Sequence, residues 1–135
     1  MSKVAVAGNA SGTGTVTLAA PNTNSDYTLV LPGGISALTD AATITPNFAD
    51  NATFSVTLGG NRAIANPSNP VEGQSGSIFI AQDGTGTRTL GWGTYWQFPG
   101  GTTPILSTTA GAVDRVDFIV RTTTAVHAVF TGDYS

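Results

Sequence analysis

The scarcity of helix-forming charged residues constrains the fold of this chain more than any other feature of its sequence. Its 135 residues include one Glu, one Lys and one His, against 22 Thr and 17 Gly. Helix surfaces are normally covered by Glu, Lys, Arg and Gln, whereas Thr and Val favour strands and Gly and Asn favour turns. The composition therefore argues strongly against a helical bundle, disfavours a doubly wound α/β fold and favours an all-β protein.

Short segments of alternating apolar and polar residues recur at intervals of about 8–12 residues, which is typical of a β-sandwich or a closed barrel. In residues 113–121 the alternation places Val116, Phe118 and Val120 on one face, and Asp117 on the other. Further strands are expected at residues 15–19, 27–31, 42–45, 53–58, 62–65, 77–82, 87–92, 95–98, 105–106 and 125–130. The predicted fold is an antiparallel β-sandwich, with a jelly-roll-like arrangement as one form of it.

Hairpin turns are expected where Gly, Asn and Asp gather between two strands. Asp83-Gly84 predicts a hairpin between residues 77–82 and 87–92, and the cluster at 21–26 predicts one between 15–19 and 27–31. Residues 77–82 are apolar on both faces, which is typical of a central strand or of one covered by another chain.

The length fits one domain, and we expect residues 15–135 to form it, preceded by an extended N-terminal arm at residues 1–14. The net charge is −3 with no basic run, so nucleic acid is not an expected partner. No apolar stretch is long enough for a transmembrane helix or a signal peptide, so no membrane partner is expected. Because there is no cysteine, disulfides and thiol chemistry are excluded.

No constellation for catalysis, cofactor binding or metal binding stands out, so the sequence predicts a protein that is not an enzyme. His127 is interpreted as a surface or interface residue, and Asp114 and Asp117 are expected to face opposite sides of their strand. A glycosidase pair could be assembled only from distant carboxylates: Asp26, Asp50, Glu72 and Asp83.

Three weaker patterns each have a plain interpretation. The glycines around Arg88 match no phosphate-binding motif, and the two Asn-x-Ser/Thr patterns, at Asn9 and Asn51, are expected by chance in a Thr-rich chain. An aromatic cluster could be a sugar-binding platform, but core and interface rim are the favoured interpretation; its members are Trp92, Tyr95, Trp96 and Phe98.

Several segments together resemble virion structural modules of tailed bacteriophages. They are GNRAIANPSNP (60–70), GQSG (73–76), QDGTGTRTL (82–90), WGTYWQFPGG (92–101) and VDRVDFIV (113–120), together with GTGTVTLAAPNTNSDYTLVLP (12–32). The resemblance implies a β-sandwich, usually trimeric, exposed on a virion and without enzymatic activity.

Within that family the chain is short for a tail fibre, which normally carries a shaft and an attachment domain. The expected function is therefore that of a capsid decoration (cement) protein. Such a protein is made in the host cytoplasm, forms a homotrimer and binds the major capsid protein on the capsid surface. The alternatives are a small tail or tail-fibre protein that binds host glycan through residues 92–98 and, below both, a glycan-cleaving enzyme.

Overall fold

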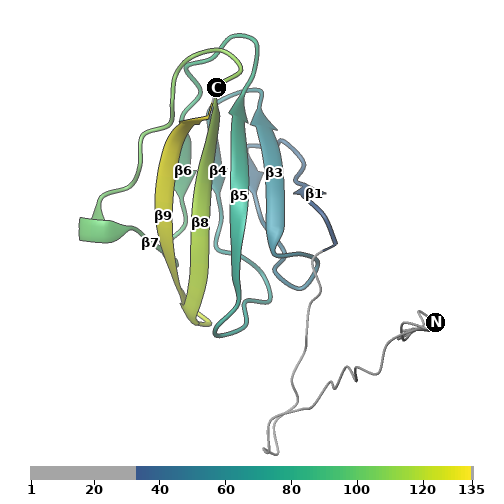
Figure 1. Ribbon diagram of the computed structural model, residues 1–135, viewed down its shortest axis with the longest axis vertical. Helices are drawn as coiled ribbons and strands as arrows, with labels where there is room; N and C mark the ends of the chain where they lie inside the picture. The colour runs from purple at the N-terminus through teal and green to yellow at the C-terminus, as the bar shows by residue number, and fades with distance from the viewer. Residues whose placement is uncertain (1–32, 135) are drawn as a thin grey trace, which may run out of the picture.

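The computed structural model describes residues 33–134, and these form two β-sheets with no α-helix among them (Figure 1). The large sheet has the order β1-β3-β5-β8-β9-β7 and the small sheet the order β2-β4-β6. The strands are β1 (Ser36–Ala37), β2 (Thr43–Ile44), β3 (Thr53–Leu58), β4 (Arg62–Ile64), β5 (Ser75–Gln82), β6 (Leu90–Trp92), β7 (Trp96–Gln97), β8 (Val113–Thr122) and β9 (Ala125–Tyr134), with a 3-10 turn η1 (Pro99–Gly101).

The all-β class is confirmed, but the sheets are mixed and not the purely antiparallel sheets expected of the predicted sandwich: β5, β8 and β9 pair antiparallel, and the other neighbours pair in parallel. Up to β6 the chain alternates between the two sheets, so β1, β3 and β5 are parallel neighbours in one sheet and β2, β4 and β6 in the other. Parallel strands need a crossover between them, and here the crossover is a strand of the opposite sheet. We call each pair of successive strands a coil: β1–β2, β3–β4 and β5–β6.

The coils stack with a variable repeat length. Ser36 lies beside Phe54, and Phe54 lies beside Ile78, so the second step along the chain is longer than the first. This variability hides the repeat in the sequence, because loops of different length separate equivalent positions. Period-2 alternation indicates which face of a strand is buried, but it carries no information on strand direction.

The hairpin predicted at Asp83-Gly84 is also wrong, because the chain crosses there from β5 to β6. Gln82, which is buried, fixes this crossing. Its side-chain amide donates to the Arg88 carbonyl (3.0 Å) and its Oε1 accepts the Arg88 N–H (2.8 Å). Both ends of the loop are thereby tied together, and β6 is directed into the small sheet.

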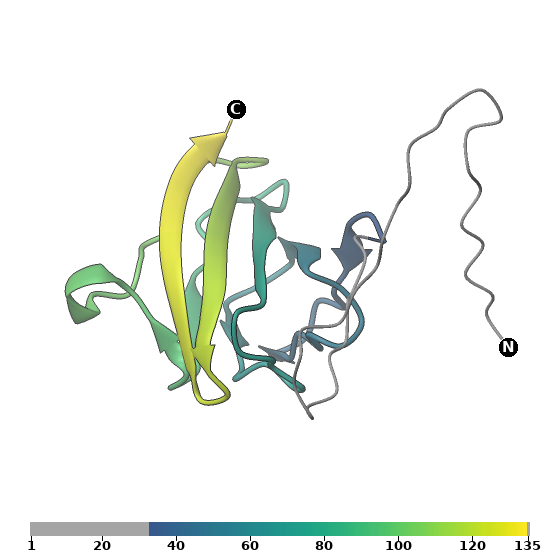
Figure 2. The same cartoon turned by 60° about the horizontal axis from the view of Figure 1, so that its bottom comes forward.

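A hairpin of two long strands completes the large sheet. β8 pairs antiparallel with β5 and with β9, and β7 joins the far edge in parallel with β9 (Figure 2). The predicted inward face of β8 is confirmed, since Val116, Phe118 and Val120 are all buried. The strand predicted at residues 105–106 is not formed, because these residues belong to the loop between η1 and β8.

One core joins the coils to the hairpin. Phe48, from the loop after β2, is 1% exposed and its ring stacks on Phe54 (6.0 Å between centroids) and on Phe118 (4.5 Å). Trp96 meets Phe48 and Phe118 edge to face. The predicted strands at 15–19 and 27–31 and the predicted arm at 1–14 lie outside the described residues.

Candidate functional site

The outer face of the hairpin exposes aliphatic side chains beside polar ones. Ile119 is 49% exposed and Val129 is 55% exposed, and they point outward from β8 and β9. The strand register places Ile119 beside His127, and His127 beside Gln97 of β7, in one row across the sheet. Asp117 lies opposite Val129 in the adjacent row. We call these five residues the hairpin patch.

The charged group of the hairpin patch, Asp117, already has partners. Asp117 accepts hydrogen bonds from the Ser77 hydroxyl (2.6 Å) and from Arg115 Nε (3.0 Å), and the Arg115 guanidinium lies 5.2 Å from the centroid of the Tyr134 ring. Burying a charged group in an interface costs less free energy when the group is already paired in the free protein, because its partner replaces the water that it loses.

His127 is exposed, as predicted for a surface residue. Arg121 Nε donates to its Nε2 atom at 2.9 Å. Because Nε2 is the acceptor, this hydrogen bond fits the neutral imidazole with its proton on Nδ1. No nucleophile or carboxylate of residues 33–134 forms a hydrogen bond with His127, so the described part of the chain holds no catalytic triad around it.

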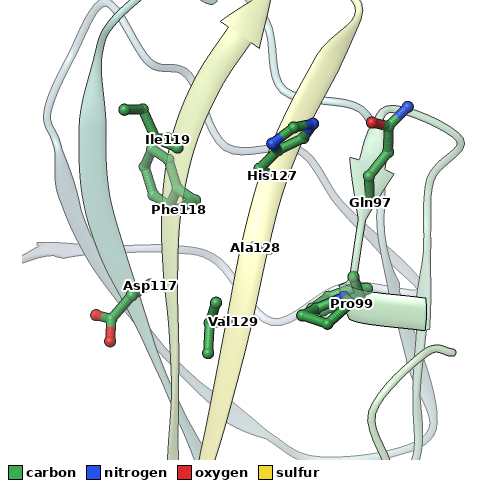
Figure 3. Close-up of a pocket in the computed structure, with 9 residues that line it drawn as sticks. Gln97, Pro99, Asp117, Phe118, Ile119, His127, Ala128 and Val129 are labelled. Atoms are coloured by element: carbon green, nitrogen blue, oxygen red, sulfur yellow. The ribbon is translucent and has the colours of Figure 1, made fainter. Parts of the chain in front are cut away.

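A groove of about 560 Å³ runs along the patch between β9 and η1. In Figure 3 the side chains of Gln97 and His127 lie at one end, those of Asp117 and Val129 at the other, and Pro99 forms the side wall. η1 projects outward at the β7 edge of the large sheet (Figure 1). Branched aliphatic side chains, an amide, an imidazole and a carboxylate therefore line one surface.

The aromatic cluster near β6 and β7 does not form an exposed platform. Trp96 is 6% and Phe98 8% exposed, and both rings contact Trp92, at centroid distances of 5.3 Å and 4.9 Å. The Trp96 indole N–H donates to the Ala65 carbonyl (2.9 Å). The interpretation of this cluster as core is confirmed for Trp96 and Phe98, while Trp92 and Tyr95 are half-buried at its margin.

The two acidic residues of β8 face opposite sides, as predicted. Asp114 is 1% exposed and accepts the backbone N–H groups of Ser107 (2.8 Å) and Asp133 (2.9 Å). It therefore fastens the loop before β8 and the end of β9 to each other. Its contacts give it a structural role that the sequence does not reveal.

The carboxylates weighed for catalysis do not come together in the described residues. Asp83 accepts from Arg88 and from the N–H groups of its own turn, and the Arg88 guanidinium holds the pKa of Asp83 below its usual value. Asp50 and Glu72 are exposed, and Asp26 lies outside the described residues. Within residues 33–134 there is no cluster of three His, Asp or Glu side chains able to hold a metal ion.

The remaining sequence motifs also have structural roles. Arg88, the basic residue among the glycines, is bound to Asp83 at 2.7 Å. Asn51 is buried, and its side-chain amide donates to the Gly34 carbonyl (3.0 Å), so this Asn-x-Thr pattern serves to anchor a turn. Asn9 lies outside the described residues.

Comparisons add no family: no family model, no curated protein and no solved structure matches the chain. In the described part of the chain no helix is long and apolar enough to cross a membrane.

Proposed function

We propose that this protein is a bacteriophage virion structural protein, a capsid decoration protein that binds the assembled head and bridges capsomers of the major capsid protein. The observation that carries the proposal is the hairpin patch, where Ile119 and Val129 are exposed beside polar groups that already have partners, Asp117 with Arg115 and His127 with Arg121. The sequence resemblance to tailed-phage virion modules supplies the virion context.

The free-energy cost of forming an interface depends on the charges that it buries. A stable protein interface buries about 1,600 Å² in total, and unpaired charges in it lose their hydration. Only 10% of the residues of this chain are charged. Hence a large part of its surface can be buried against a neighbour at little electrostatic cost.

A homotrimer fits this role through avidity. If three copies of the patch engage one lattice together, effective concentration raises the overall affinity by about 10²–10⁴ over a single contact. Free capsid subunits present one site at a time and gain nothing from this effect. The decoration protein should therefore bind assembled capsids and not free subunits.

The test compares two valines of equal exposure. Val129, on the patch, is 55% exposed, and Val71, before β5, is 56% exposed. Val129→Lys should lower the affinity for purified capsids at least about tenfold, whereas Val71→Lys should leave it unchanged. Equal binding by both variants would remove the patch from the proposal.

Location and oligomeric state are tested separately. Electron microscopy of virions should place the protein on the head, and light scattering should give about three times the 13.6 kDa monomer mass. A protein found only at the tail would contradict the decoration role.

A small tail or tail-fibre protein that binds host glycan is the second candidate, and the groove beside β9 favours it. Ligand sites combine apolar walls with a few polar groups that fix orientation, and the groove offers Gln97, Asp117 and His127 for hydrogen bonds. Calorimetry with host surface glycans tests this candidate: the wild-type protein should bind glycan and Gln97→Ala should weaken that binding, whereas absence of glycan binding by the wild-type protein would rule the candidate out.

A further inference from the structure

The stack of coils is open at its first end. Among residues 33–134, β1 pairs only with β3 and β2 only with β4, so the outer edges of both strands have no described partner. Between these two edges lies a hollow of about 390 Å³, which the core residues Ile44 and Phe54 help to line. The open edges of the two sheets and the hollow between them therefore lie together at the same end of the stack.

An open end of this kind needs a cover. A coil cannot bury its apolar face alone, so stacked repeats require a terminal unit that closes the core. Unpaired edge strands also expose N–H and C=O groups that bind any extended chain, and natural proteins cover or blunt such edges. A suitable cover supplies two strands, one for each edge, with apolar side chains turned inward.

The segment that precedes β1 has this pattern. Residues 15–19 alternate, with Val16 and Leu18 on one face, and residues 27–31 place Leu29 and Leu31 on one face. Residues 20–26 separate the two runs, and a stretch of the same length, residues 83–89, separates β5 from β6 in the third coil. In the third coil, that spacing carries the chain from the large sheet to the small one.

We infer that residues 15–31 of the same chain form a further coil that closes this end, with residues 15–19 alongside β1 and residues 27–31 alongside β2. The connection back to β1 is long enough. Residues 32–35 span up to about 13 Å when extended, and facing sheets lie about 10 Å apart. Gly34 has φ of +90°, a conformation that lets the chain turn sharply into β1.

This inference does not depend on the decoration role. It assigns residues 15–31 to the folded body and leaves residues 1–14 as the part of the chain available to a neighbouring molecule. Strand exchange would place the same segment of a second copy on the same edges, so the test has to separate the two sources.

The decisive experiment uses the full chain and two neighbouring substitutions. Leu18→Asp places a charge on the inward face and should lower Tm by more than about 5 °C, whereas Thr17→Asp, on the outward face, should shift Tm by less than about 2 °C. If neither variant shifts Tm, residues 15–19 do not pack on the body and the inference is wrong.

A second measurement needs no variant and so remains decisive if Leu18→Asp does not fold. Amide hydrogen exchange of the wild-type protein should show protection within 15–19 and 27–31, and protection of β1 and β2 on their outer edges. Rapid exchange throughout residues 15–31 would overturn the inference. Dissociation of an oligomer by Leu18→Asp, with Tm unchanged, would assign the segment to a second copy and would also overturn it.

Discussion

The large sheet contains two kinds of strand: β1, β3 and β5 belong to the coils, whereas β8 and β9 form the hairpin. In the coils, strands of two to eight residues pair with strands of a neighbouring coil, and polar side chains in the loops fasten one coil to the next. In the hairpin, two strands of ten residues pair with each other across a short turn. The coils therefore depend on contacts between distant loops, whereas the hairpin depends on its own register and leaves its outer face open.

The largest expected effect lies where the two regions meet. Phe118 of the hairpin stacks at 4.5 Å on Phe48, from the loop that joins the first coil to the second, so Phe118→Ala should cost about 3–5 kcal/mol of stability. Asp117→Asn, one residue away and half-exposed, should cost less than about 1 kcal/mol. Denaturant titration measures both. If both variants are destabilised equally, the assignment of faces on β8 is wrong. Amide hydrogen exchange of Phe118→Ala adds a second readout: if protection is lost in the hairpin alone, the hairpin and the coils unfold independently.

Gly76 tests the fit of β5 between the coils and the hairpin. A Cβ atom there would run into the Ala52 carbonyl oxygen and lie 2.8 Å from the Phe118 ring. Gly76→Ala should therefore cost about 3 kcal/mol in the same titration. Gly84→Ala is the matched control, because nothing lies within 4 Å of its Cβ position. Equal stability of the two variants would mean that β5 can shift freely against the loop at Ala52.

The two strands of the hairpin can be predicted from the sequence, and the arrangement of the coils cannot. The alternation in residues 113–121 identifies the buried face of β8 correctly, and the strand expected at residues 125–130 is formed as part of β9. The β5–β6 crossing is predicted as a hairpin, since a turn signal such as Asp83-Gly84 does not distinguish a return into the same sheet from a passage to the other one. The sequence does place Gln82 in register with Ile78 and Ile80, on a face that is otherwise apolar, and the structure shows that this polar residue is buried.

The candidate site can be predicted in part. Alternation places Asp117, Ile119 and His127 outside the core, which the structure confirms, but their alignment with Gln97 depends on the parallel pairing of β7 with β9. That pairing brings Gln97 beside His127, with the whole of β8 between them in the chain, and no local pattern encodes it. Phe48 escapes prediction for a similar reason, because it lies in a loop and its ring packs on residues of three other elements.

A smaller effect is expected at the loops that fasten the coils. Asn66 Oδ1 accepts the Tyr95 N–H (2.9 Å) and its amide donates to Thr94 (3.2 Å), so Asn66→Ala leaves a half-buried N–H without its partner. The expected cost is about 1–2 kcal/mol. Asn61→Ala removes a similar bond to the Thr89 N–H, but Asn61 is exposed and water replaces it, so a lower cost is expected. Thermal melts of both variants rank them, and the reverse order would contradict the role of Asn66.

The smallest expected effect is the loss of stability at low pH, and the two ion pairs that should cause it both lie in the coils. Arg62 holds the pKa of Asp40 below its usual value and Arg88 does the same for Asp83, and both pairs belong to the coils. A carboxyl group whose pKa is lowered by folding contributes its full stability above the usual value, about 4, and loses it as the pH falls through the lowered pKa. Both pairs are near the surface and screened by water, so Tm should fall only slightly on their account as the pH falls below about 4. In the double variant Asp40→Asn, Asp83→Asn this part of the acid response should disappear, and the difference should also shrink in high salt. An unchanged slope in the double variant would show that acid acts on the protein elsewhere and that these two pairs do not stabilise the coils.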